Sequence, residues 1–178
     1  MKNHYFIGFA LFVGSLLSGC TGMPEQVSPV SPFSLEQYQG KWYEIARLDH
    51  SFERGLENVT ANYVINEDGS VTVLNRGFNA QDNEWSEAQG KAQFVASNNE
   101  GHLKVSFFGP FYSSYVVFGL DQQDYQYAYV SGYNTDYLWL LARTPQVSEQ
   151  RIADFKAAAQ QRGFNTEQLI MVMQSPTN

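Results

Sequence analysis

The side chains that most often carry out catalysis or bind metals are scarce in this 178-residue chain. It has a single cysteine, Cys20, and three histidines, of which His50 and His102 lie in different predicted loops. A Ser–His–acid triad or a His-rich metal site is therefore poorly supplied. Glu44 and Glu53 are a candidate acid pair, but Glu53 lies in a charged loop. We expect a protein that is not an enzyme, with no catalytic residue, metal site or cofactor.

Cys20 lies in a sequence context that is typical of a modified cysteine rather than of a catalytic one. It follows an uncharged, mostly apolar run, Tyr5–Leu17, which is too short to span a bilayer but has the length of the apolar region of a signal peptide. The sequence Leu17-Ser18-Gly19-Cys20 resembles the lipobox of bacterial lipoproteins, whose cysteine becomes the acylated N-terminus. The alternative is an ordinary secretory signal with a cysteine there by chance.

The lipobox resemblance implies that residues 1–19 are a lipoprotein signal peptide and that residues 20–32 are a lipidated, Pro-rich tether. Several acyl chains would anchor the protein stably. Thr21 is not the Asp that marks retention in the inner membrane, so the implied location is the periplasmic face of the outer membrane of a Gram-negative bacterium. The tether would extend by about 3.1 Å per residue, or it is a disordered tail with no spacing role.

The amino-acid composition limits both the kind of partner and the class of protein that we expect. The net charge of -7 disfavours binding to nucleic acid, and the negative mean hydropathy excludes a multi-span membrane protein. The chain nevertheless contains 13 Phe, 11 Tyr and 3 Trp, with only 16% charged residues. This aromatic content indicates a protein that lines an apolar space.

The elements that must position these side chains are mostly strands. Ser34 and Gln37 match a capping box for a short helix, and Gly40 ends that turn. Apolar and polar residues then alternate in successive runs with short connections, which is typical of antiparallel strands. We predict eight strands, at 42–46, 59–65, a run from 71, 85–95, 103–107, 115–120, 125–131 and 137–143.

The period changes from 2 to 3.6 near the C-terminus. Ser148 is a predicted N-cap, and Gly163 ends the helix that follows it. Residues 169–173 could add a ninth strand. The pattern predicts an all-β fold, an eight-stranded antiparallel up-and-down barrel with a C-terminal α-helix packed outside, in residues 33–174, followed by a tail at 175–178. Small inward residues (Ala61, Ala88, Gly90 and Ala92) favour a ligand cavity, and the alternative is a filled barrel or a sandwich.

Two motifs resemble those of lipocalins. Gly40-Lys41-Trp42-Tyr43 resembles their Gly-x-Trp motif, and Arg143 resembles their conserved arginine at the end of the last strand. The resemblance implies that Trp42 and Arg143 meet at the barrel base as a cation–π pair. For the Thr-Asp-Tyr motif we take Asp121 with Tyr125 as a degenerate equivalent, because Asn134–Tyr137 matches the letters but lies at the open end. The predicted base residues are Gly40, Trp42, Asp121 and Arg143.

Longer stretches narrow the resemblance. Residues 42–47, 52–55, 105–112 and 138–145 resemble, in this order, bacterial outer-membrane lipocalins of the Blc type, which are close to apolipoprotein D. This resemblance covers about residues 33–174 and implies a carrier of fatty acids or lysophospholipids that serves envelope maintenance. A scaffolding lipoprotein that binds another envelope protein through the barrel rim is the alternative. The stretch Phe108–Tyr112 could make that contact or a homodimer contact.

The lipocalin resemblance, together with strand alternation, predicts which residues line the cavity. If Arg143 points into the base, residues two apart on its strand share its face. Simple core packing is the alternative for Trp139, and an exposed loop position is the alternative for Tyr112. Arg47, Arg54 and Arg76 are candidate partners for a lipid headgroup at the mouth, or solvated surface charges. The predicted lipid-binding residues are Phe107, Tyr112, Tyr115, Val117, Tyr137, Trp139 and Leu141.

Overall fold

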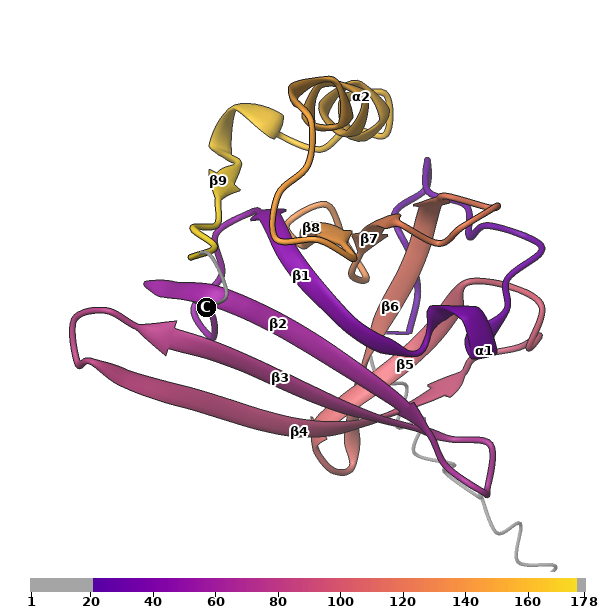
Figure 1. Cartoon of the computed structure of the whole chain (residues 1–178). Coiled ribbons are helices and arrows are strands. Elements are labelled where there is room, and N and C mark those ends of the chain that lie inside the picture. The colour runs from indigo at the N-terminus through magenta and orange to yellow at the C-terminus, as the bar shows by residue number, and fades with distance from the viewer. Residues whose placement is uncertain (1–20, 176–178) are drawn as a thin grey trace, which may run out of the picture.

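A computed structural model describes residues 21–175, along which strands predominate (Figure 1). Cys20 and the predicted signal peptide lie outside the described residues. The strands are β1 (Gly40–Arg47), β2 (Leu56–Ile65), β3 (Val71–Asn79), β4 (Glu84–Phe94), β5 (His102–Phe108), β6 (Phe111–Leu120), β7 (Tyr127–Ser131), β8 (Leu138–Ala142) and β9 (Ile170–Met171). The helices are α1 (Leu35–Tyr38), α2 (Glu149–Gln160) and the 3-10 turn η1 (Thr166–Gln168).

Strands β1 to β8 form the predicted closed barrel. Each strand pairs antiparallel with the next, and β1 pairs with both β2 and β8, which closes the ring. Only the first half of β1 pairs with β2, through contacts such as Trp42 with Ala61. Strand β9 pairs with the other half at Ala46 and Arg47, so the predicted ninth strand is confirmed as a short cover for that edge.

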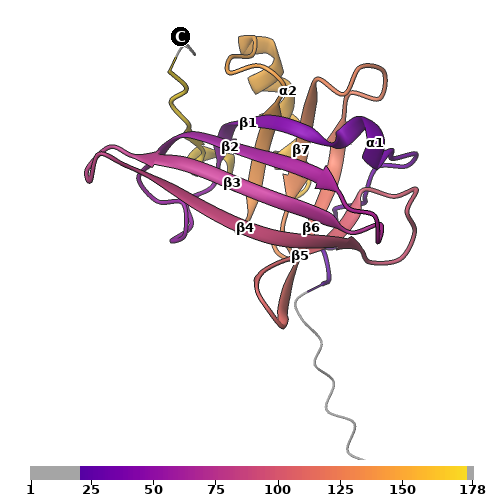
Figure 2. The ribbon, with the colours of Figure 1, turned by 60° about the horizontal axis from the view of Figure 1, so that its bottom comes forward.

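On β6, β7 and β8, inward and outward residues face two separate apolar clusters. On β8, Trp139 and Leu141 belong to the cluster inside the barrel, whereas Leu138 and Leu140 belong to the cluster outside it. Helix α2 covers the outer cluster with the fully buried Phe155, on the side of β1, β7 and β8 (Figures 1 and 2). The predicted helix packed outside the barrel is therefore confirmed.

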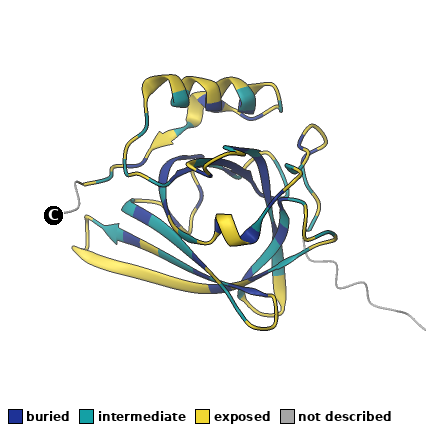
Figure 3. Cartoon of the chain, turned by 45° about the vertical axis from the view of Figure 1, so that its right-hand side comes forward, coloured by how far each residue is buried: buried dark blue, intermediate teal, exposed yellow. Residues whose placement is uncertain are grey.

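Helix α1 lies across one end of the barrel, where Figure 3 shows it within the ring of strands. Its N-cap is Ser34, as predicted, since the Ser34 hydroxyl accepts a hydrogen bond from the Gln37 N–H at 3.3 Å. The reciprocal half of the capping box is absent in these described residues, because the Ser34 N–H donates instead to the Tyr125 hydroxyl at 3.0 Å. Leu35 and Tyr38 are buried in the inner cluster, so α1 closes the base of the barrel.

The segment before α1 differs from the extended tether that its prolines suggest. The Val30 N–H donates to the carbonyl of Val117 on β6 at 2.8 Å, and the Gly101 N–H donates to the Val30 carbonyl at 2.9 Å. Val27 is buried in the outer cluster. These backbone hydrogen bonds and this apolar burial hold the segment against the barrel wall. In residues 21–175 no helix has the length and apolar character required to cross a membrane.

Candidate functional site

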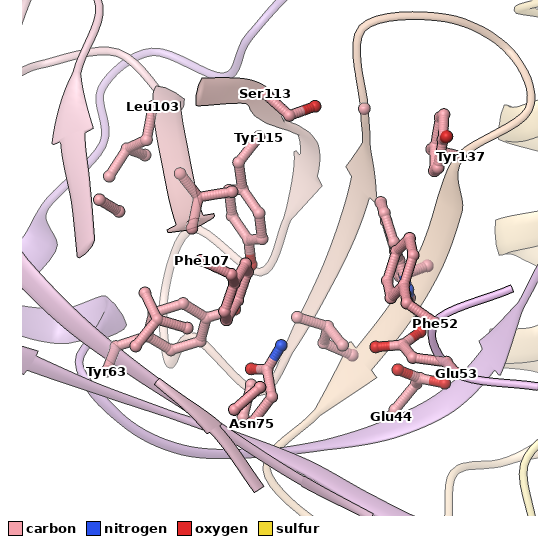
Figure 4. Close-up of a pocket in the computed structure, with 18 of the residues that line it drawn as sticks. Glu44, Phe52, Glu53, Tyr63, Asn75, Leu103, Phe107, Ser113, Tyr115 and Tyr137 are labelled. Carbon is pink, nitrogen blue, oxygen red and sulfur yellow. Dashed lines mark hydrogen bonds between the residues drawn. The ribbon is translucent and has the colours of Figure 1, made fainter. Parts of the chain in front are cut away.

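A cavity of about 630 Å³ opens at the end of the barrel opposite α1. Its volume lies within the range of about 300–1,000 Å³ that is typical of small-molecule sites. The wall is mostly apolar, with aromatic rings from β2, β5, β6 and β8 (Figure 4). The predicted small residues leave this space, since Ala61, Ala88 and Ala92 line it. Gly90 instead lies under a ring, because a Cβ there would come within 2.9 Å of Phe107.

Six of the seven predicted cavity residues line this wall, namely Phe107, Tyr112, Tyr115, Tyr137, Trp139 and Leu141. The prediction was wrong for Val117. It belongs to the inner cluster but is fully buried at the base, where its backbone is bonded to the N-terminal segment. Strand alternation gave the correct face of β6, but it could not show how far the cavity extends before core packing fills the barrel.

Three tyrosine hydroxyls form a polar group at the inner end of the cavity. The Tyr115 hydroxyl lies 2.6 Å from that of Tyr38 and 2.8 Å from that of Tyr63. Burial raises the pKa of all three hydroxyls, so they remain neutral at physiological pH. The three hydroxyls hydrogen-bond to one another and are neutral, so the floor of the cavity is polar but uncharged.

The base motif is assembled as predicted. The Arg143 guanidinium lies 3.9 Å from the centre of the Trp42 ring. The Trp42 indole N–H donates to the Tyr38 carbonyl at 2.7 Å. Gly40 has a φ of +91°, so any other residue there would strain the backbone, although a Cβ would make only an ordinary contact, at 3.5 Å, with Arg143 Nη1.

The β6–β7 loop supplies the degenerate second motif. The Asp121 carboxylate accepts hydrogen bonds from the N–H groups of Gln123 and Gln126. This loop presents the Tyr125 carbonyl, which accepts a bond from Arg143 Nε at 3.2 Å. The residues 134–137, which match the motif by letters, lie instead in the β7–β8 loop, where Asn134 and Asp136 bond to each other.

The three arginines predicted at the mouth have different environments. The prediction was wrong for Arg47, which is 2% exposed and forms an ion pair with Glu44 at 2.8 Å. Arg54 is exposed, does not line the cavity, and pairs with Asp49 at 2.6 Å. Arg76 does line the cavity, with its guanidinium 4.0 Å from the Trp85 ring centre.

Sequence reasoning considered Glu44 and Glu53 as an acid pair but missed the buried polar cluster that they form in the cavity wall. Glu53, expected in a charged loop, is 7% exposed, and it lines the cavity together with Glu44. Glu53 Oε2 lies 2.6 Å from His50 Nε2 and accepts the Trp139 indole N–H at 3.1 Å. The two spacings of three residues, Glu44 to Arg47 and His50 to Glu53, are the only local signal for it.

The cluster is electrostatically unusual for an apolar cavity. Burial raises the pKa of the Glu44 carboxyl well above its ordinary value, and the nearby charge of Glu53 raises it further, while Arg47 opposes both effects. His102 lies elsewhere, 3.2 Å from the Ser114 hydroxyl, and burial lowers its pKa. In residues 21–175 no group of three or more His, Cys, Asp or Glu side chains is placed to hold a metal ion.

The rim of the mouth exposes aromatic side chains. Phe108 and Phe111, at the β5–β6 turn, are 83% and 72% exposed, and Phe52 is 61% exposed. The lipocalin reading places the opening at this end. The turn also contains the stretch Phe108–Tyr112 that the sequence nominates for a protein contact.

The comparisons with known proteins agree with this geometry. The sequence matches the family described as "Lipocalin-like domain" over residues 33–174. It is 58% identical to the outer membrane lipoprotein Blc of Vibrio cholerae over 166 residues, which cover 93% of this chain and 97% of that protein. It is 46% identical to the outer membrane lipoprotein Blc of Escherichia coli over 151 residues, 85% of each chain.

Solved structures agree on the fold. Insecticyanin from the tobacco hornworm Manduca sexta matches with a TM-score of 0.69 at 18% identity, and the match covers 87% of this chain and 88% of that one. The closed eight-stranded barrel and the Trp42–Arg143 base pair have the geometry that the resemblance implied. The chain therefore belongs to the lipocalin family, and its relatives include the outer membrane lipoproteins named Blc.

Proposed function

We propose that this protein is a non-enzymatic carrier that stores or transports fatty acids or lysophospholipids in the maintenance of the cell envelope. The observation that carries the proposal is the cavity of about 630 Å³, whose wall is largely aliphatic and aromatic. Each buried CH₂ of an acyl chain contributes about 0.8 kcal/mol, so a long chain supplies most of the affinity. The family supports this class of ligand, since lipocalins bind small apolar molecules.

The proposed location is the periplasmic face of the outer membrane, with the acylated Cys20 as the anchor. Two relatives that are named outer membrane lipoproteins support it, as does the lipobox-like sequence at residues 17–20. The backbone bonds of Val30 to Val117 and Gly101 hold the chain against the barrel wall ten residues after Cys20 (30 − 20). The barrel would therefore sit close to the membrane rather than on a long tether.

A second candidate is a scaffold that binds another envelope protein, or a second copy of this chain, through the rim. The exposed Phe108 and Phe111 favour it, because large apolar side chains gathered at one turn often mark a contact surface. A homodimer formed through this turn is compatible with lipid binding, whereas a pure scaffold would leave the cavity without a ligand.

The test is a titration of residues 21–178, which contain every strand and helix of the described structure, with lysophospholipid and with fatty acid. Trp139 lies in the cavity wall, so its fluorescence should report saturable binding with a dissociation constant in the micromolar range or tighter. Trp139→Ala should weaken binding, whereas Trp85→Ala, outside the cavity lining, should not, and both variants are compared with wild type by isothermal titration calorimetry because Trp139 is itself the fluorescent reporter. Absence of binding by a folded protein would contradict the carrier and favour the scaffold, and turnover of the lipid would indicate an enzyme.

A further inference from the structure

The cavity has two chemically different sides. In Figure 4 the aromatic and aliphatic side chains of Tyr63, Leu103 and Phe107 lie on one side, and the carboxylates of Glu44 and Glu53 lie on the other. Both acids have partners in the protein, Arg47 for Glu44 and His50 with Trp139 for Glu53, but a purely apolar ligand would offer no donor to the remaining carboxylate oxygens. The acidic side is therefore a determinant of which headgroup the cavity accepts.

The hydrogen bonds of Glu53 reach only one of its two carboxylate oxygens. Both of its donors, His50 and the Trp139 indole, act on the same oxygen, Oε2. In the described part of the chain no donor reaches Glu53 Oε1, although the side chain is only 9% exposed and lines the cavity. A carboxylate oxygen without a donor, on a largely buried side chain that lines the cavity, is a strong acceptor for a charged donor.

His50 reaches only one of the two oxygens of Glu53. Its Nε2 lies 2.6 Å from Glu53 Oε2, whereas its Nδ1 is buried and has no hydrogen-bond partner among the described residues. The contact with His50 therefore leaves Glu53 Oε1 available to another donor.

Arg47 compensates only one of the two acids. Its Nη1 pairs with Glu44 at 2.8 Å, and its Nη2 donates to the backbone carbonyls of Glu53 and Leu56 rather than to the second carboxylate. Two carboxylates therefore share one guanidinium. Burial raises the pKa of the Glu44 carboxyl, and the charge of the second carboxylate, Glu53, raises it further.

Two further features favour a cation that carries N–H groups. The side-chain oxygen of Asn75, a residue of the cavity wall, is a buried acceptor without a donor in the described residues. The rings of Phe52, Tyr137 and Trp139 stack in series beside the acids, with centroids 6.4 Å and 6.2 Å apart. Aromatic faces attract ammonium groups, and the free oxygens accept their hydrogens.

We propose that Glu53, assisted by Glu44 and Asn75, forms a subsite for a protonated amine, and that the cavity selects amphiphiles whose headgroup carries an ammonium over those that end in a carboxylate. This inference rests on the proposed carrier function. Two kinds of ligand carry such a group, a free long-chain amine and a lysophospholipid with an ethanolamine headgroup.

The experiment compares three probes with the same twelve-carbon chain, dodecylamine, dodecanol and dodecanoate, each below its micelle-forming concentration, by Trp fluorescence of residues 21–178. We expect dodecylamine to bind at least about tenfold more tightly than dodecanoate, since a charged hydrogen bond in a buried site has that effect on affinity. Glu53→Gln should remove most of this advantage and leave dodecanol within about twofold of wild type. Glu84→Gln, the same change at an exposed position outside the cavity lining, should alter neither.

A second arm compares lysophosphatidylethanolamine with lysophosphatidylglycerol of the same acyl chain. A preference for ethanolamine that Glu53→Gln abolishes identifies the phospholipid as the source, and a preference confined to dodecylamine identifies the free amine. If Glu53→Gln does not fold, as judged by circular dichroism, the wild-type preference and Asn75→Leu test the same subsite. Equal binding of all headgroups would overturn the ammonium subsite and leave the carrier intact, whereas failure of every probe to bind would overturn the carrier itself.

Discussion

The guanidinium of Arg143 lies 3.9 Å from the centre of the Trp42 ring and donates hydrogen bonds to three successive carbonyl oxygens at the end of α1. These carbonyls, of Gln37, Tyr38 and Gln39, have lost their helical partners because the helix stops there. One side chain therefore joins the last strand, the first strand and the helix that closes the base.

Replacement of Arg143 should consequently destabilise the whole barrel. We expect Arg143→Ala to lower the free energy of unfolding by about 3 kcal/mol, as the sum of a cation–π contact and charged hydrogen bonds. The free energy of unfolding of Arg143→Lys should lie between those of wild type and Arg143→Ala, because an ammonium cannot stack on a ring and bridge several carbonyls as a planar guanidinium does. Urea denaturation followed by fluorescence measures both, and a change below about 0.5 kcal/mol for Arg143→Ala would contradict the structural role.

Filling the cavity should separate binding from stability. Ala88 lines the cavity near the exposed end of β4, so Ala88→Phe places a ring in the ligand space. We expect the affinity for a long acyl chain to fall more than about tenfold, because several CH₂ groups lose their contacts. The matched control is Gln89→Phe, one residue along the same strand and outside the cavity lining, which should bind as wild type does.

Equal loss of affinity in both variants would show that the probe does not enter the cavity. Thermal unfolding checks that each variant keeps its fold, and a large fall in the melting temperature of Ala88→Phe alone would mean that the space at this position is smaller than the structure indicates.

The β2–β3 turn should make stability depend on pH in the acid range. The hydroxyl and N–H of Ser70 and the ammonium of Lys91 donate to the Asp68 carboxylate, which holds the pKa of Asp68 well below its usual range. A pKa lowered by folding adds stability that is complete above the ordinary value near pH 4 and is lost as the pH falls below it. Asp68→Asn should therefore have a lower melting temperature than wild type at pH 7, with a difference that shrinks toward pH 3. A difference that stays constant from pH 7 to pH 3 would show that the charge of Asp68 is not involved.

The anchor can be tested by fractionation of cells that express the full chain. Cys20→Ala removes the thiol that the lipobox would acylate, so we expect the protein in the soluble periplasmic fraction instead of the outer membrane. Thr21→Asp, which keeps the cysteine but introduces the residue typical of inner-membrane retention, should move the protein to the inner membrane. Retention of Cys20→Ala in the outer membrane would exclude acylation as the means of attachment.

Much of the fold follows from local pattern. The alternation around Trp139 and Leu140 places one side chain inside and the next outside, because a strand has a period of two and only one face meets the cavity. Ser34 and Ser148 were identified as N-caps because their chemistry acts within three residues. The Trp42–Arg143 pair could be predicted because the lipocalin motifs single out both residues and an eight-strand meander brings the first and last strands together at the base.

The polar wall of the cavity was decided by tertiary structure. His50 and Glu53 read as part of a charged loop, and they are buried because the β1–β2 connection folds back so that Glu53 meets Trp139, 86 residues away along the chain. The alternation of residues along the chain gives no indication of that contact, because the contact depends on where a loop without secondary structure folds back on the barrel. The sequence by itself determined the strands, their inward faces and the barrel that follows from them, because those depend on period and neighbouring residues. The depth of the cavity, which stops short of Val117, and the unmatched acid in its wall depend on long-range packing, and only the folded chain decides them.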